Sequence, residues 1–291
     1  MIIDSHCHAW AYWPYEPQVP DPETRGTAEQ LIYEMNRNGI QQATIVSAQI
    51  WHNPDNNSYV SEAVQRFPSR LHQYADVDSS WSDTYHVTGA AKRLEKAANQ
   101  LPIKGFTHYL APDDDGGWLH SQEGTDFFAV ANERRLIASI SCQPRHQPAI
   151  RRVAERFPEL PILCHHLGAL KASESPPYEN LNNVLGSASF PNIYLKFSGF
   201  HYLSDQSERF EYPYPATMWI YRACYEAFGN RMCWGSDYPA VSPDMTYQQA
   251  LEAFRRHCSF VSATDREAIL GGTLRRLLDW ARDVGPYATN A

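Results

Sequence analysis

Short runs of apolar and β-branched residues alternate along the chain with longer stretches in which apolar residues recur at helical spacing. This alternation is typical of βαβ units built around a parallel sheet. The short runs predict strands at residues 2–6, 42–49, 71–77, 102–110, 135–142, 161–165, 192–198 and 231–236. Eight parallel strands are the number that closes an α/β barrel. We therefore predict a (β/α)8 barrel, the TIM-barrel fold of the α/β class.

The longer stretches predict helices at residues 27–39, 58–67, 89–100, 125–135, 148–157, 216–229 and 262–280. The first of them carries a signal at each end, because Thr27 suits an N-cap and Gly39 suits a C-cap. A chain of 291 residues is ordinary for one barrel of about 250 residues. No internal repeat, low-complexity tract or linker divides it. The pattern predicts a single barrel domain over residues 1–291.

Three connections that follow predicted strands are long and rich in aromatic residues, at residues 9–26, 167–180 and 198–215. In a barrel, such βα loops shape the active-site mouth at the carboxyl ends of the strands. Their rings would suit a lid over a planar or sugar-like substrate, or they would merely cover the barrel top. Both interpretations stay open for Trp10, Tyr12, Trp13, Tyr15, Tyr178, Tyr202, Tyr212 and Tyr214.

The net charge and the cysteine content limit the kinds of binding partner and the cellular compartment that we expect. A net charge of -8 argues against a broad nucleic-acid-binding surface. The six cysteines form no CxxC pair and sit mostly in apolar runs, which indicates reduced, buried thiols. The chain begins on an apolar strand, and it contains no run of about 18 apolar residues. We expect a soluble cytoplasmic protein that binds a small molecule and not a membrane, and a homo-oligomer stays open.

The first predicted strand ends in a histidine pair. In DSHCH, at residues 4–8, positions two apart share a face of the strand. His6 and His8 would therefore both point into the barrel mouth, with Asp4 below them and Cys7 on the other face. Two imidazoles on one face suit a divalent metal, a proton transfer or the binding of an anion.

Two later strands also end in ionisable residues. The sixth runs into LCHHLG, at residues 163–168, where one of His165 and His166 should face inward and the other outward. The eighth leads into WGSDYP, at residues 234–239, with Asp237 at the end of the strand. Pro239 prevents the strand from continuing, because proline has no backbone N–H to donate. A buried carboxylate needs a partner, which would be a metal, a histidine or a reacting water.

These motifs, together with the KFSG of residues 196–199, resemble the amidohydrolase-related branch of the amidohydrolase superfamily. That branch includes 2-pyrone-4,6-dicarboxylate lactonases, sugar lactonases and, more distantly, aromatic-acid decarboxylases. The resemblance runs from residue 2 to about residue 280. It implies that His6, His8, His166 and Asp237 are the catalytic residues. It also implies that a metal, where one is bound, would be held by His6, His8 and Asp237.

The chain departs from this family pattern at three places. Metal-dependent relatives usually carry a histidine in an H-P turn after the fifth strand, where this chain has Gln143. Glutamine is a weak ligand for zinc, so the choices are one divalent ion, with zinc preferred, and a metal-free site. The lactonase Gly-Ile-Arg on the fourth strand is GFTH here, at residues 105–108, and the asparagine of a C-terminal G-N-x-R is Thr273.

Five further residues follow or end predicted strands and are candidates for substrate binding: Arg145, His108, Gln143, Lys196 and His201. Arg145 would replace the missing fourth-strand arginine as an anion clamp. Lys196 shares a face of the seventh strand with Ser198.

Three functional hypotheses follow. The first is hydrolysis of a lactone or related cyclic ester by a water that Asp237 activates, with His6, His8 and His166 stabilising the oxyanion. The alternative is metal-dependent, non-oxidative decarboxylation of an aromatic or muconate-type acid. The third is a barrel that binds a small ligand without catalysis.

Overall fold

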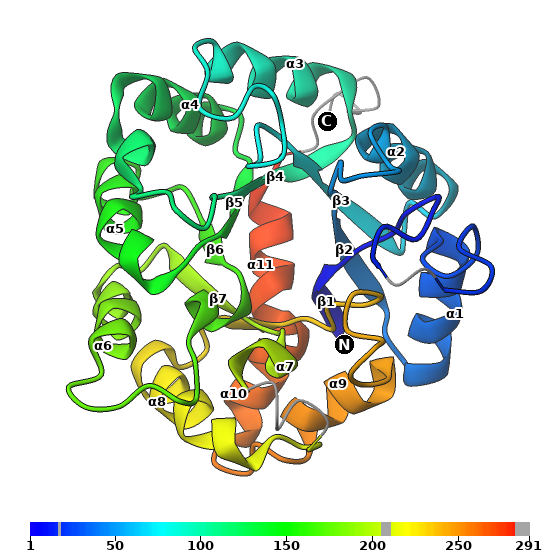
Figure 1. Cartoon of the computed structure of the whole chain (residues 1–291), viewed down its shortest axis with the longest axis vertical. Coiled ribbons are helices and arrows are strands. Elements are labelled where there is room, and N and C mark those ends of the chain that lie inside the picture. Colours follow the sequence, from blue (N-terminus) through cyan, green and yellow to red (C-terminus); the bar gives the residue numbers. More distant parts are fainter. Residues whose placement is uncertain (17–18, 205–210, 283–291) are drawn as a thin grey trace.

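The computed structural model describes residues 1–16, 19–204 and 211–282. Its eight strands are parallel and pair in chain order from β1 to β8, with helices around them (Figure 1). They are β1 Ile3–Cys7, β2 Gln42–Val46, β3 Leu71–Asp76, β4 Ile103–Tyr109, β5 Ile137–Ser141, β6 Ile162–Cys164, β7 Ile193–Phe197 and β8 Met232–Trp234. The predicted (β/α)8 barrel is confirmed. Seven strands lie inside their predicted ranges, and β1 extends one residue further.

The barrel closes where β8 meets β1. The Asp237 amide donates to the His6 carbonyl at 2.7 Å, and the His8 amide donates to the Tyr238 carbonyl at 2.6 Å. The two segments approach closely because Gly235 has no side chain. A Cβ atom at this position would lie 2.7 Å from the His6 Cβ, well inside van der Waals contact. The closure therefore places His6 and Asp237 side by side.

Asp4 stabilises this seam, the junction between β1 and the segment that follows β8. The sequence motif predicts its place below His6 and His8. Its Oδ1 accepts from the amides of His6, at 3.0 Å, and Ser236, at 2.9 Å. Its Oδ2 accepts from the Tyr247 hydroxyl at 2.7 Å. Burial raises the pKa of Asp4 to about 6, although these hydrogen bonds oppose the rise. Asp4 is a structural carboxylate that joins β1, the end of β8 and the helix that follows.

The helices are α1 Ala28–Asn38, α2 Asn56–Arg66, α3 Ala90–Gln100, α4 Gln122–Glu133, α5 Gln147–Arg156, α6 Glu179–Gly186, α7 Phe200–Leu203, α8 Met218–Phe228, α9 Tyr247–Arg255, α10 Ala263–Glu267 and α11 Thr273–Trp280. The six predicted between residues 27 and 229 are confirmed. The helix predicted at 262–280 is confirmed over residues 263–280, where a π-helical turn at Ala268–Gly272 lies between α10 and α11. Helices α6, α7 and α9 were not predicted.

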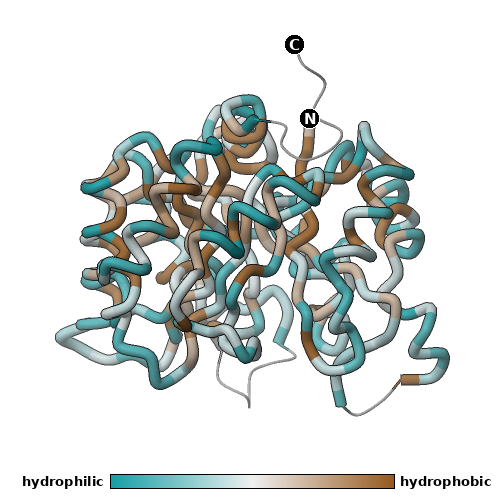
Figure 2. Tube along the Cα trace, turned by 90° about the horizontal axis from the view of Figure 1, so that it is seen from above, coloured by the Kyte–Doolittle hydropathy of each residue, from teal (hydrophilic) through white to brown (hydrophobic). Residues whose placement is uncertain are grey.

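Helix α11 crosses the barrel (Figure 1) and closes its amino-terminal end. Leu274, Leu277 and Leu278 pack against side chains that fill the barrel interior, among them Ile3 and Tyr74. A second, larger apolar layer lies between the strands and the surrounding helices, while hydrophilic residues are frequent on the outer turns (Figure 2). With one end filled, access to the interior is left to the carboxyl ends of the strands. Within the described ranges, no helix is long and apolar enough to span a bilayer.

Candidate active site

The four residues predicted to carry the chemistry converge at the barrel mouth. Asp237 Oδ1 lies 3.4 Å from His6 Nε2, 3.5 Å from His8 Nε2 and 3.9 Å from His166 Nε2. The carboxylate is buried, with 1% of Asp237 exposed to solvent. Residues from the first, sixth and eighth strands are therefore within reach of one reacting atom.

The backbone is in the left-handed region at two of these residues. Asp237 has a φ of 60° and His166 a φ of 46°, values that are uncommon for residues other than glycine. At Asp237 the conformation is held by the hydrogen bond to His6 and by a Val241 amide that donates to the Asp237 carbonyl. Each side chain is thereby turned out of the strand direction and toward the other.

The expectation that only one of His165 and His166 faces inward is wrong. The ring centroid of His6 lies 4.5 Å from that of His165 and 4.6 Å from that of His166. Alternation fails because β6 ends at Cys164 and the chain turns at His166. Both imidazoles therefore join the cluster, with His166 nearer the carboxylate.

Hydrogen bonds fix the proton on His8. Its Nδ1 lies 2.7 Å from the Val46 carbonyl, and a carbonyl only accepts, so Nδ1 carries the proton. In the neutral ring, Nε2 then presents a lone pair to Asp237 Oδ1. Two acceptors at 3.5 Å need a proton or a cation between them. This arrangement favours a proton or a metal ion between His8 Nε2 and Asp237 Oδ1.

Lys196, predicted to bind substrate, lies fully buried beneath the cluster. Its Nζ is 3.1 Å from His6 Nδ1 and donates to Ser139 Oγ at 2.7 Å. As an ammonium it has no acceptor, so it donates to His6 and leaves the proton of that ring on Nε2, facing Asp237. Burial lowers the pKa of Lys196 to about 7. Lys196 thus positions His6, and Ser139, which sequence reasoning missed, links it to His165 Nε2 at 2.7 Å.

Asp237 is ionised in this setting. Burial alone would raise its pKa, but His166 and the close contacts with His6 and His8 outweigh burial and hold the pKa well below the usual range. Burial lowers the pKa of His166 to about 4, even though Asp237 opposes this shift. At neutral pH the site therefore pairs a carboxylate with a neutral His166.

Three other predicted substrate-binding residues make contacts of their own. His201 Nε2 lies 3.7 Å from Asp244 Oδ2. The Gln143 backbone amide donates to His146 Nδ1 at 3.0 Å, and the Gln143 backbone carbonyl accepts from the His146 amide at 2.9 Å, at the start of a short 3-10 helix. Arg145 is exposed and donates to the Asp114 carbonyl at 3.1 Å, so its guanidinium is directed at backbone. Contacts of Gln143 and Arg145 with the four converging residues are not seen among the described interactions.

The structure does not bring His108 into the cluster. His108 lies on the outer face of β4, between the barrel wall and α4, where its ring centroid is 6.0 Å from that of Phe127. Its Nδ1 is 3.0 Å from the Val77 carbonyl, and its Nε2 is 3.3 Å from His86 Nε2. The next residue, Tyr109, points inward instead.

Part of the aromatic content of the loops lines the mouth. The Trp10 ring stacks on His8, with centroids 4.9 Å apart and an angle of 11° between the planes. Tyr202 lies against His166 at 5.1 Å. Other rings pack elsewhere, as Tyr178 does against Trp219. Some of these rings therefore line the mouth and others pack away from it. Of the predicted loop 198–215, residues 205–210 lie outside the described residues.

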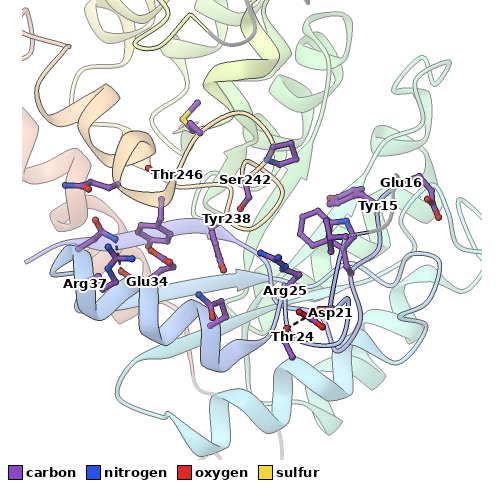
Figure 3. A pocket seen from close by; sticks show the side chains of 18 residues that line it. Tyr15, Glu16, Asp21, Thr24, Arg25, Glu34, Arg37, Tyr238, Ser242 and Thr246 are labelled. Carbon is purple, nitrogen blue, oxygen red and sulfur yellow. Dashed lines mark hydrogen bonds between the residues drawn. The ribbon is translucent and has the colours of Figure 1, made fainter.

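A cavity of about 910 Å³ lies beside this cluster, but none of the four converging residues lines it. It runs between α1 and the segment that joins β8 to α9, with Glu34 and Arg37 on one side and Tyr238 and Thr246 on the other (Figure 3). Tyr15 forms part of its wall. The cavity lacks the converging imidazoles, so we place the chemistry at the barrel mouth.

Gly199 gives a test of how His166 is held. Its φ is 65°, and a Cβ there would lie 2.5 Å from His166 Nδ1, on the side where Ser198 Oγ contacts that atom at 3.0 Å. Gly199→Ala is expected to displace the imidazole and lower kcat about 10-fold or more.

Steady-state kinetics and a thermal melt measure this effect, with Gly229→Ala as the control. Gly229 also has a positive φ, of 55°, but nothing within 4 Å of the added Cβ. Equal kcat values for the two variants would contradict the proposed contact.

The donor set fits a divalent metal. Ligand atoms of His6, His8 and Asp237 lie within 4.8 Å of one another, and those of His6, His165 and His166 form a second such group. Within the described part of the chain, His6 Nε2 and Asp237 Oδ2 are buried without a hydrogen-bond partner. Imidazole nitrogens with a carboxylate are suitable ligands for zinc.

Comparison with known proteins places this geometry in a family. The family model described as Amidohydrolase matches residues 3–280. The L-fucono-1,5-lactonase of Burkholderia ambifaria is 25% identical over 252 residues, which cover 81% of this chain and 80% of that protein.

Solved structures share the fold. An amidohydrolase from Burkholderia multivorans with bound zinc has a TM-score of 0.77 at 19% identity, and a probable 2-pyrone-4,6-dicarboxylic acid hydrolase from Acinetobacter baumannii with bound citric acid has 0.75 at 18%. Each comparison covers 96% of this chain and 99% of the other. Because the family model spans nearly the whole barrel and the predicted motifs within it, the chain belongs to the Amidohydrolase family and is a hydrolase.

Proposed function

We propose that this chain hydrolyses a lactone, a cyclic ester, using Asp237 as the general base. The observation that carries the proposal is the ionised, buried Asp237 carboxylate facing His6, His8 and His166 within 3.9 Å. Such a site can hold a water, remove its proton and stabilise the oxyanion that forms next. The relationship to an L-fucono-1,5-lactonase supports a lactone as the ring that opens.

The reaction would proceed in two steps. Asp237 takes a proton as the water oxygen attacks the lactone carbonyl carbon, and the carbonyl oxygen becomes an oxyanion. A Ser198 hydroxyl that donates to His166 Nδ1, at 3.0 Å, leaves a proton on Nε2, from which His166 stabilises that oxyanion. When the ring C–O bond breaks, Asp237 returns its proton to the leaving oxygen. The product is one hydroxy acid, so the atoms and charges balance.

His6, His8 and Asp237 are the residues that would hold a metal, with zinc preferred. When bound, such an ion would act as a Lewis acid and would lower the pKa of a bound water to about 7. His8 Nε2 and the carboxylate present lone pairs directly. His6 Nε2 does so only when its ring proton lies on Nδ1, facing a neutral Lys196 amine. A metal-free reaction would rely on the imidazoles alone.

The charges at the mouth favour a neutral, polyhydroxylated lactone over a dicarboxylate. Lys196 lies beneath the cluster and is engaged with His6 and Ser139. Arg145, the predicted anion clamp, is directed at the Asp114 carbonyl. Aromatic rings such as Trp10 and Tyr202 line the mouth. Such rings suit the apolar faces of a sugar ring, while a phenol hydroxyl can bond its hydroxyl groups.

A substrate panel tests the proposal. Neutral sugar-acid lactones, a carboxylated pyrone and 2,6-dihydroxybenzoate are assayed with and without added zinc, following acid release in a pH-stat and carbon dioxide in parallel. We expect acid release from the neutral lactones above the spontaneous rate, weaker activity on the pyrone and no carbon dioxide. Carbon dioxide release from the aromatic acid without lactone hydrolysis would replace the proposal with the decarboxylase alternative.

A further inference from the structure

Two tryptophans stand exposed on neighbouring loops at the barrel mouth. Trp51 follows β2 and is 69% exposed, and Trp81 follows β3 and is 37% exposed. Strands β2 and β3 are paired, so both loops leave adjacent positions at the carboxyl ends of the strands. Single exposed apolar rings are common on proteins, but two of them at the mouth of a site mark a place where a ligand can bind.

Each indole is connected to the catalytic imidazoles through a short row of rings. The Trp81 centroid lies 4.6 Å from that of Tyr109, which in turn lies 5.1 Å from that of His165. Trp51 contacts Tyr15, with the centroids 5.8 Å apart. The exposed rings therefore continue the lining of the mouth outward, and a substrate that begins at the imidazoles would extend across them.

The row that begins at Trp51 ends at another imidazole of the cluster. Tyr15 lies 5.5 Å from Trp10 in an edge-to-face contact, and Trp10 stacks on His8. The rows from the two neighbouring loops therefore end at different members of the histidine cluster.

One carboxylate fixes both loops. Asp76 Oδ2, at the end of β3, accepts from the Trp81 indole N–H at 2.8 Å and from the Gln49 amide, two residues before Trp51, at 2.7 Å. Trp51 itself has a φ of 42°, a strained conformation for a bulky residue that persists only where the surrounding structure enforces it. Asp76 thus fixes the Trp81 indole directly and the backbone that leads to Trp51.

We propose that Trp51 and Trp81 form an outer sugar-binding platform, so that this enzyme acts on lactones that carry a second sugar. The proposal rests on the proposed lactonase function and extends it from the reacting ring to the size of the substrate. The lactone ring lies at Asp237, and the second ring stacks its C–H face on the indoles. Asp76 is a positioning residue for the platform.

Kinetics of Trp81→Ala on two lactones test this proposal. Cellobiono-1,5-lactone carries the second sugar, and glucono-1,5-lactone lacks it. Loss of one stacked ring should raise the KM for the two-ring lactone about 2- to 12-fold. Its kcat and both constants for the one-ring lactone should stay within about twofold. Trp81→Phe, which keeps a ring, should recover part of the affinity.

Tyr33→Ala is the matched control, because Tyr33 is 53% exposed but lies on α1. Thermal melts identify any variant that fails to fold, and Trp51→Ala then provides the same comparison from the other loop. An equal rise in KM for both lactones, or none in either tryptophan variant, would overturn the platform.

Calorimetry with cellobiitol, which contains no lactone, separates the platform from the catalytic proposal. If the wild type hydrolyses no lactone but binds cellobiitol in a manner that Trp81→Ala weakens, the platform stands and the proposed function falls. If the wild type neither hydrolyses the two-ring lactone in preference to the one-ring lactone nor binds cellobiitol, the platform is wrong.

Discussion

Replacing Asp237 with asparagine is expected to lower kcat about 1,000-fold while the barrel remains folded. An amide oxygen has no basicity near neutral pH, so the attacking water loses its proton acceptor, and general-base catalysis is worth about 100- to 10,000-fold. The pKa of Asp237 lies well below its usual range, so the wild-type rate should show no loss from protonation of this residue as the pH falls from 7 to 5.

The fold should tolerate this change because asparagine has the shape of aspartate and one more donor. Its Nδ2 can donate to His8 Nε2, which presents a lone pair at this point, while the Asp237 backbone hydrogen bond to His6 is kept. Single-turnover kinetics and a thermal melt are the measurements. Asp279→Asn is the control, since Asp279 is exposed and pairs with Arg275 on the surface of α11. A Asp237→Asn enzyme with more than a tenth of the wild-type kcat would show that another group takes the proton.

The core of the site could be predicted from local rules. His6 and His8 are two residues apart at a strand end, so they had to share a face. Asp237 follows the last strand, two residues before Pro239. In a closed barrel the last strand lies beside the first, so Asp237 was expected near His6 and His8. The same alternation excludes His108 from the barrel interior. Gly105 packs against Tyr74 inside the barrel, and His108, three residues later, therefore lies on the outer face of the strand.

Contacts between distant segments could not be predicted in this way. The rule of alternation does not apply beyond Cys164, where β6 ends, so the inward turn of both His165 and His166 follows from backbone angles that the residue types do not reveal. Nor does the sequence show that Ser139 joins Lys196 to His165, because that link spans three strands.

One missed element did have a local signal. Thr246 and Gln249 form a reciprocal capping box at the start of α9, the T-x-x-Q pattern that marks a helix N-terminus. This helix carries Tyr247, whose hydroxyl bonds Asp4 and so supports the seam that holds His6 beside Asp237.

Replacing Lys196 with methionine is expected to separate stability from activity. Its pKa of about 7 in the fold, compared with about 10.4 in an unfolded chain, means that the buried ammonium costs about 5 kcal/mol when charged. Methionine fills similar volume without that charge, but it removes hydrogen bonds to His6 and Ser139 worth about 1 kcal/mol each. The variant should therefore be about 3 kcal/mol more stable at pH 6, while kcat falls about 10- to 100-fold because His6 loses the donor that fixes its proton.

The pH dependence gives this prediction a definite sign. Between pH 7 and 10 the unfolded wild-type chain retains the Lys196 proton that the folded protein has released, so its free energy of unfolding gains a term that rises with pH. Methionine has no such term, and contributions from cysteines and tyrosines are common to both proteins. The stability advantage of Lys196→Met should thus be largest at pH 6, vanish at about pH 9 and become a disadvantage toward pH 10, where only the loss of the two hydrogen bonds remains. Urea unfolding in EDTA and reductant measures it, with Lys92→Met on the exposed face of α3 as control. An advantage that stays constant across this range would mean that the Lys196 amine is already neutral at pH 6, and the donor role assigned to it at His6 would be wrong.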